Sequence, residues 1–209
     1  MAQISNHFLS LLLISIFCIS GTVVESSNPS YPRRQSGAAA AYIRAACDNT
    51  SYPALCMHYL SMYANSSTIP SPLQLSQVVL SVSLNRVQST SSYISKELRA
   101  TKGMERQILE DCLELINMST DALSDSIREV HALVSPRTPI DDVLEHISNV
   151  EDSVSAAMTF VSDCTDGESP GEKKRKFKGT MKRKLLNAEQ SVTIVLDLFD
   201  QYAGRYYKP

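Results

Sequence analysis

The stretch MERQILEDCLELINMSTDALSDSIREVHALV, residues 104–134, carries apolar side chains at spacings of mostly three and four. This spacing places them on one face of an α-helix, with acidic and hydroxyl residues between them. We therefore expect an amphipathic helix about eight turns long from Met104 to about Val134. The apolar positions are Ile108, Leu109, Cys112, Leu115, Ile116, Ala122, Leu123, Ile127, Val130 and Leu133.

A second long helix is predicted before this stretch. Ser71-Pro72-Leu73-Gln74 combines a capping serine, a proline in the first turn and a glutamine that completes a capping box. The helix that begins there is expected to reach about Thr101, and Gly103 marks the break before the next one.

Two more helices are predicted after the stretch. One begins after Thr138 and reaches about Cys164, and the last runs from about Lys174 to Tyr202. Short connections between long amphipathic helices make neighbours antiparallel. The sequence thus predicts an antiparallel up-and-down four-helix bundle over residues 70–204.

A helical hairpin, residues 37–66, is expected before the bundle. Its arms are the helix-prone segments 38–47 and from Pro53 to about Asn65. Cys47 and Cys56 lie in different arms, so a disulfide between them would pin the hairpin. The fold class is therefore all-α, and seven glycines and nine prolines in 209 residues are too few for an all-β chain.

The N-terminus contains an uncharged apolar run from Phe8 to Val24, which is typical of a secretory signal peptide. We assign residues 1–26 to that peptide, with cleavage between Ser20 and Ser27, and residues 27–36 to a flexible leader. A membrane anchor is the alternative, but a span needs about 20 strongly apolar residues. The mature protein is expected to be secreted, with no membrane attachment.

Signal-peptide cleavage removes Cys18 and leaves an even number of cysteines in an oxidising compartment, which favours two disulfides. A bridge between Cys112 and Cys164 would fasten two adjacent bundle helices. The same secretory route makes three asparagines candidate N-glycosylation sites, namely Asn49, Asn65 and Asn117.

Catalytic motifs are absent from the sequence. Outside the signal peptide the histidines are His58, His131 and His146, and none lies in a metal-ligand or catalytic pattern. No nucleotide-binding loop is found either. We expect a protein that is no enzyme, needs no cofactor or metal, does not bind nucleic acid, and works through its surface.

A basic segment, residues 173–184, contains eight of the 20 basic residues and no acidic one. The rest of the chain has 12 basic against 22 acidic residues. The net charge of −2 therefore conceals a basic segment and an acidic remainder. The segment is either a solvated helix start or a site for an acidic polymer such as pectin. Its basic residues are Lys173, Lys174, Arg175, Lys176, Lys178, Lys182, Arg183 and Lys184.

An acidic stripe follows the helix 104–134, where Glu114, Asp121 and Asp125 project at similar angles. It is either an ordinary solvent-exposed face or a docking surface for a basic partner.

Three cysteine-containing segments closely resemble the plant invertase and pectin methylesterase inhibitor family. They are CDNTSYPALC (47–56), LEDCLELINMSTDALSDS (109–126) and SNVEDSVSAAMTFVSDCTDG (148–167). The resemblance implies bridges from the first to the second cysteine and from the third to the fourth. It also implies that residues 37–204 form an inhibitor domain of the cell wall (apoplast), which binds a carbohydrate-active enzyme and blocks its cleft.

Within that family, IRAACDNTSYPALC and SNVEDSVSAAMT look more like the pectin methylesterase inhibitor branch. In that branch the enzyme-facing positions correspond to Glu114, Asp121 and Asp166, whereas Met118 stands where Asp is common. A stoichiometric complex with pectin methylesterase is the expected function. The alternatives are an inhibitor of cell-wall or vacuolar acid invertase and a pectin-binding structural protein.

Overall fold

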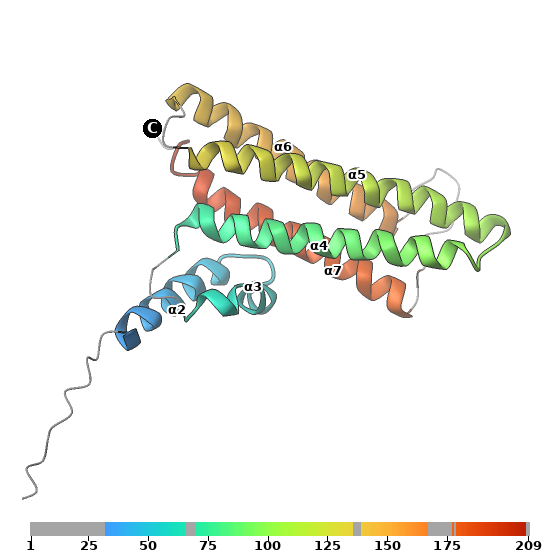
Figure 1. Cartoon of the computed structure of the whole chain (residues 1–209), viewed down its shortest axis with the longest axis horizontal. Helices are drawn as coiled ribbons and strands as arrows, with labels where there is room; N and C mark the ends of the chain where they lie inside the picture. Colours follow the sequence, from blue (N-terminus) through green and yellow to red (C-terminus); the bar gives the residue numbers. More distant parts are fainter. Residues whose placement is uncertain (1–31, 66–69, 136–138, 167–176, 178, 208–209) are drawn as a thin grey trace, which may run out of the picture. The chain divides into compact units, whose positions relative to one another are not determined.

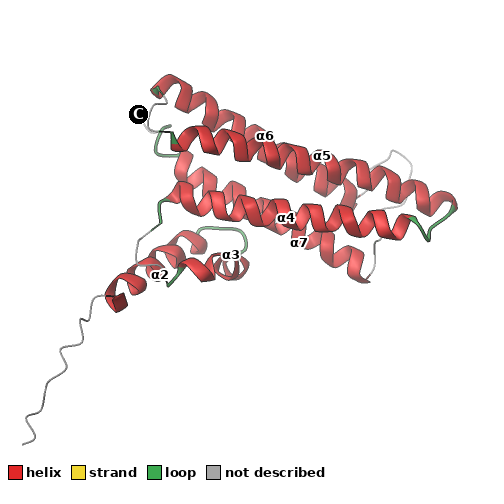
Figure 2. Cartoon of the chain, in the orientation of Figure 1, coloured by secondary structure: helices red, strands yellow, loops and turns green. Residues whose placement is uncertain are grey.

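The computed structural model describes residues 32–65, 70–135, 139–166, 177 and 179–207. Within this part of the chain every regular element is helical (Figure 2). The bundle consists of four helices, each lying beside two others (Figure 1). They are α4 (Pro72–Leu98), α5 (Gly103–Val134), α6 (Ile140–Asp166) and α7 (Gly179–Ala203). Helix α5 packs between α4 and α6, and α7 closes the bundle against the same two helices, which confirms the predicted fold class.

The start of α4 has the predicted capping box. The Ser71 hydroxyl accepts a hydrogen bond from the Gln74 main-chain N–H at 3.2 Å. The Ser71 N–H donates in return to the Gln74 side-chain oxygen at 2.7 Å. These bonds satisfy two polar groups at this helix end. At the other end, Gly103 has φ +66°, a left-handed conformation that favours glycine and separates α4 from α5.

Several helix boundaries differ from the sequence-based expectation. Helix α7 begins at Gly179 rather than at Lys174, and Gly179 has φ +58°. Positive charge is unfavourable at a helix N-terminus, so the basic residues before Gly179 give little support to an earlier start. Helix α6 extends to Asp166, past Cys164.

The N-terminal helix α2 (Pro32–Asp48) begins earlier than predicted, within residues expected to belong to the leader. Proline is favourable in the first turn of a helix, and the alanines at 38–41 favour its continuation. The predicted signal peptide, residues 1–26, lies outside the described residues. None of the described helices has a stretch long and apolar enough to span a membrane.

The bundle core confirms the apolar pattern of the stretch 104–134. Leu109, Cys112, Ile116, Leu123 and Val130 are buried. Four more of the predicted apolar positions are half-buried against the core, namely Leu115, Ala122, Ile127 and Leu133. Fully burying a leucine-sized side chain contributes about 1.5–3 kcal/mol, so this face dominates the stability of α5. Large buried side chains from the other bundle helices include Leu75, Leu80, Ile94, Ile147, Leu185, Ile194, Leu198 and Phe199.

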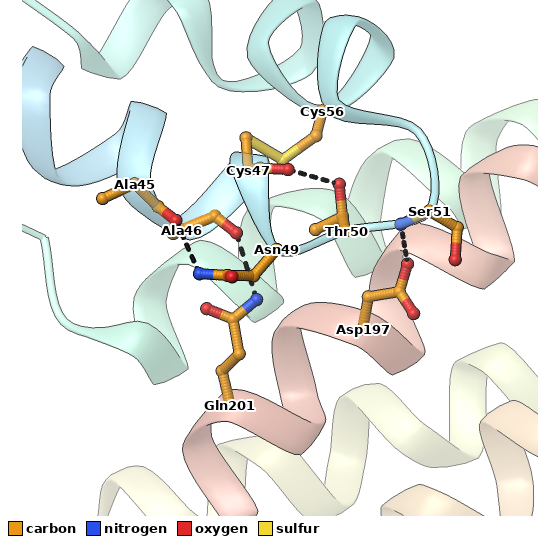
Figure 3. The surroundings of a disulfide bond; sticks show 9 residues. All are labelled: Ala45, Ala46, Cys47, Asn49, Thr50, Ser51, Cys56, Asp197 and Gln201. Atoms are coloured by element: carbon orange, nitrogen blue, oxygen red, sulfur yellow. Dashed lines mark hydrogen bonds between the residues drawn. A yellow bond between two sulfur atoms is a disulfide. The ribbon is translucent and has the colours of Figure 1, made fainter.

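The hairpin consists of α2 and α3 (Pro53–Leu60), followed by the short helix η1 (Ser61–Tyr63). A disulfide joins Cys47 to Cys56 across a Cα–Cα distance of 5.5 Å. Closing this short loop restricts the unfolded chain, which is worth about 3 kcal/mol in the chain-entropy model. Figure 3 shows the bridge and the Thr50 hydroxyl, which donates to the Cys47 carbonyl at 2.8 Å.

Two hydrogen bonds attach the hairpin to α7 (Figure 3). The Ser51 main-chain N–H donates to the Asp197 carboxylate at 2.6 Å. The Gln201 side-chain amide donates to the Ala46 carbonyl at 3.0 Å. The hairpin is therefore pinned by its own disulfide and also by side chains of the last bundle helix.

Candidate functional site

The candidate docking face lies on α5, where Glu114, Met118 and Asp121 follow one another at helical spacing. All three side chains are exposed, Met118 to 42%. Among the residues that the structure describes, neither Glu114 nor Asp121 has a hydrogen-bond or ion-pair partner. This face thus presents two hydrated carboxylates on either side of an apolar side chain.

Other acids along α5 are already paired within the chain. Glu110 forms an ion pair with Arg106 at 2.9 Å, and Asp125 forms one with Arg128. Both pairs are exposed and lie on one helix, so each contributes only a few tenths of a kcal/mol. The pairing nevertheless neutralises part of the charge of Glu110 and Asp125. Glu114 and Asp121 are therefore the stronger acceptors for a cation on this face.

Helix α5 is held firmly against α6 behind this face. A disulfide joins Cys112 to Cys164 across a Cα–Cα distance of 4.8 Å. The Ser119 hydroxyl donates to the Ala157 carbonyl at 3.0 Å, and both residues are buried. Because these two links are close in sequence to Glu114 and Asp121, the acids are presented from a rigid two-helix surface.

A third link between α5 and α6 involves a glutamate and a histidine. The Glu129 carboxylate lies 2.6 Å from His146 Nδ1 and accepts a hydrogen bond from the Asn149 amide at 3.3 Å. The hydrogen bonds from His146 and Asn149 lower the pKa of Glu129, against the opposing effect of burial. The sequence did not reveal this contact, because residues 17 positions apart on different helices give no local signal.

Asp166, the third predicted enzyme-facing residue, is the last residue of α6, and its side chain lies outside the described part. The Cys112–Cys164 bridge brings this end of α6 beside the part of α5 that carries Glu114. The backbone thus places all three predicted positions on the α5–α6 pair.

The basic segment is only partly described. Lys182 and Arg183 are exposed in the first turns of α7. Lys184 is half-buried, because its ammonium donates to the Ser89 hydroxyl at 2.8 Å and lies 5.6 Å from the Tyr93 ring centroid. Lys184 is therefore a link between α7 and α4. The remaining predicted polymer-binding residues lie outside the described part of the chain, namely Lys173, Lys174, Arg175, Lys176 and Lys178.

The three candidate glycosylation sites, Asn49, Asn65 and Asn117, are all exposed. The Asn117 side-chain oxygen accepts a hydrogen bond from the Ser91 hydroxyl on α4 at 2.7 Å. The Asn49 amide donates to the Ala45 carbonyl at 2.9 Å (Figure 3). Their glycosylation stays a prediction.

In the part of the chain that the structure describes, no group of three or more His, Cys, Asp and Glu side chains is arranged to hold a metal ion. What this surface offers is a rigid acidic face suited to a positively charged protein partner.

Comparison with known proteins identifies relatives along most of the chain. The family model described as "Plant invertase/pectin methylesterase inhibitor" matches residues 41–198. Pectinesterase inhibitor 9 of Arabidopsis thaliana is 30% identical over 97% of this chain and 97% of its own length. Pectinesterase inhibitor 11 of the same plant is 32% identical over 91% of this chain and 95% of its own length.

Solved structures show the same fold at low identity. A crystal structure of a pectin methylesterase inhibitor from Arabidopsis thaliana superposes with a TM-score of 0.52 at 14% identity, covering 77% of this chain and 95% of that one. A mutant form of a pectin methylesterase inhibitor from Arabidopsis gives a TM-score of 0.57 at 14% identity, covering 74% and 92%.

Proposed function

The chain belongs to the plant invertase/pectin methylesterase inhibitor family, and we propose that it is a secreted inhibitor of a pectin methylesterase. The observation that carries this proposal is the similarity to two pectinesterase inhibitors along nearly the whole chain. The protein belongs to a family of inhibitors and is not an enzyme itself. It acts by forming a stoichiometric complex in which α5 and α6 cover the substrate cleft of the esterase.

The acidic face of α5 supports this mode of action. Glu114 and Asp121 lack partners in the described part of the chain, so docking breaks no internal ion pair when they meet basic groups of the enzyme. The disulfide and the Ser119 bond hold the face in one geometry before binding, which reduces the entropy lost on association. Complementary charge also accelerates the encounter and makes it sensitive to salt.

Titration separates the two candidate targets. The purified mature protein is added to pectin methylesterase and, separately, to acid invertase at the acidic pH of the cell wall. We expect esterase activity to fall linearly and reach its minimum at one inhibitor per enzyme, with invertase unaffected. Loss of invertase activity with intact esterase activity would assign the chain to the other branch of the family.

Variants test the acidic face directly. Glu114→Gln and Asp121→Asn should each weaken the complex about tenfold, because each removes one interfacial charge worth about 1.4 kcal/mol. Glu105→Gln, on the first turn of α5 and exposed, is the matched control and should leave affinity unchanged. Equal affinity of all three variants and the parent protein would place the interface elsewhere.

Secretion is part of the proposal and has a separate test. N-terminal sequencing of the protein recovered from the medium of a secreting plant cell should find a first residue between 21 and 27. Retention of Phe8 to Val24 in a membrane fraction would identify that run as an anchor instead.

A further inference from the structure

A groove of about 630 Å³ opens between the hairpin and the bundle. Tyr59 and Tyr63 line it from the α3–η1 side, and Gln77 and Asn85 line it from α4. His131, near the end of α5, forms another part of its wall. His131 is ten residues beyond Asp121, about 15 Å along the helix axis, so the groove is separate from the proposed docking face.

Aromatic surface is accessible on one side of this groove. Tyr63 is 39% exposed, and Met62 beside it is 78% exposed. Tyr59 lies deeper, and the Arg86 guanidinium sits 5.6 Å from its ring centroid without lining the groove. Such rings offer flat apolar faces together with hydroxyl groups at the edge.

Amide and imidazole side chains form the opposite side. The Gln77 amide and the His131 imidazole form no side-chain hydrogen bond with any residue that the structure describes. The Asn85 amide nitrogen donates to the Ser81 carbonyl at 3.0 Å, which leaves its side-chain oxygen for a ligand. Among the residues that the structure describes, no aspartate, glutamate, lysine or arginine lines the groove.

We propose that this groove binds a neutral oligosaccharide. Sugar rings present C–H faces that pack on tyrosine rings, and their hydroxyls both donate to and accept from amide side chains. The volume lies within the usual range for small-ligand sites, roughly 300–1,000 Å³. A carboxylate sugar would lose hydration in the groove, whose described lining has no lysine or arginine, so an uncharged sugar is preferred.

Calorimetric titration of the full mature chain tests the ligand class. One probe is a methyl-esterified oligogalacturonide, and the other is the same oligomer after de-esterification, which is anionic. We expect saturable binding of the neutral oligomer and at least tenfold weaker binding of the anionic one at equal ionic strength. The absence of saturable binding of the neutral oligomer would overturn the proposal.

Variants then locate the binding. Tyr63→Ala and Gln77→Ala should each weaken binding of the neutral oligomer at least fivefold, whereas Gln107→Ala, an exposed glutamine on α5, should not. Unchanged binding by the first two variants would contradict the assignment. The protein could instead prefer the anionic oligomer and lose this preference when the charges of Lys182 and Arg183 are reversed. Sugar binding would then lie on the basic segment, which would also contradict the proposal.

A sedimentation experiment tests whether a second copy of the chain occupies the groove. If the protein forms dimers that dissociate in the Tyr63→Ala variant, the groove holds a second copy and the proposal is wrong. The inference does not rest on the proposed inhibition, because Tyr63→Ala should leave inhibition of the esterase unchanged.

Discussion

The Ser119 hydroxyl of α5 donates a hydrogen bond to the main-chain oxygen of Ala157 on α6, at a distance of 3.0 Å. Both residues are completely buried, and they lie 38 positions apart in the sequence. Ser119 is between Glu114 and Asp121 in the chain but points into the bundle, whereas those two acids are exposed to solvent. The bond therefore supports the proposed docking face from behind.

Replacing this serine tests the support. Ser119→Ala should lower the free energy of unfolding by about 1 kcal/mol, the usual net value of one internal hydrogen bond. For a chain of this size that corresponds to a decrease in Tm of about 2–4 °C. Protein made in bacteria is required, because Ser119 also completes the candidate glycosylation triplet of Asn117. Ser92→Ala, at an exposed position of α4, is the control, and equal melting of the two variants would contradict the prediction.

Glu129 should make stability depend on acid pH. Its pKa is lowered mainly by the hydrogen bond with His146, so the folded state favours the carboxylate. The resulting stability is present above the ordinary pKa of about 4.5 and is lost as the pH falls through the lower folded value. Glu129→Gln should thus melt earlier than the parent at pH 7, and the difference should shrink as the pH falls below about 4.5. A constant difference across this range would refute the linkage.

Glu151 on α6 should change the pH dependence of stability in the opposite direction. Burial is the main cause that raises its pKa, with Asp200 and Asp152 adding repulsion, although the Tyr207 hydroxyl donates to it at 3.1 Å. A raised pKa means that the charged form is disfavoured in the folded state, so stability decreases as the pH rises through that value. Glu151→Gln should therefore melt later than the parent at pH 7 and equally below about pH 4.5. Glu145→Gln, at an exposed position of α6, is the control.

Asp197 should govern the attachment of the hairpin to α7. Asp197→Ala removes the acceptor of the Ser51 N–H, which is exposed and can bind water instead. We expect a loss of less than about 1 kcal/mol in global stability but faster hydrogen exchange in residues 42–52. Asp163→Ala, at an exposed position of α6, is the control. Unchanged hydrogen exchange in the hairpin would show that the disulfide and the apolar contacts are sufficient to hold it in place.

Charge reversal on α7 tests retention by acidic pectin. Lys182→Glu with Arg183→Glu should reduce binding to polygalacturonate at low salt about fivefold, while inhibition of the esterase in free solution is unchanged. Lys184→Ala should act on stability instead, because Lys184 contacts Ser89 and Tyr93. Equal loss of retention and inhibition would show that both functions use one surface.

Local sequence patterns were sufficient to predict the helical elements. The apolar spacing of residues 104–134, the capping box at Ser71 and the glycine at 103 act within a few residues of chain, and the structure confirms each of them. The predicted start of α7 at Lys174 was wrong. The segment before Gly179 has a helix-compatible composition, but its positive charge is unfavourable at a helix N-terminus. The exposure of Glu114 and Asp121 also followed from helical spacing alone.

The sequence by itself thus determined the all-helical class, the bundle and the cysteines available for its two disulfides. Only the tertiary structure decided which polar groups are already used inside the protein. Glu129, Lys184 and Asp197 look like surface charges in the sequence, yet each bonds to a group on another element. Helical periodicity fixes the direction of a side chain around its own axis, whereas its partners depend on how the helices pack, and the chain leaves no local record of that.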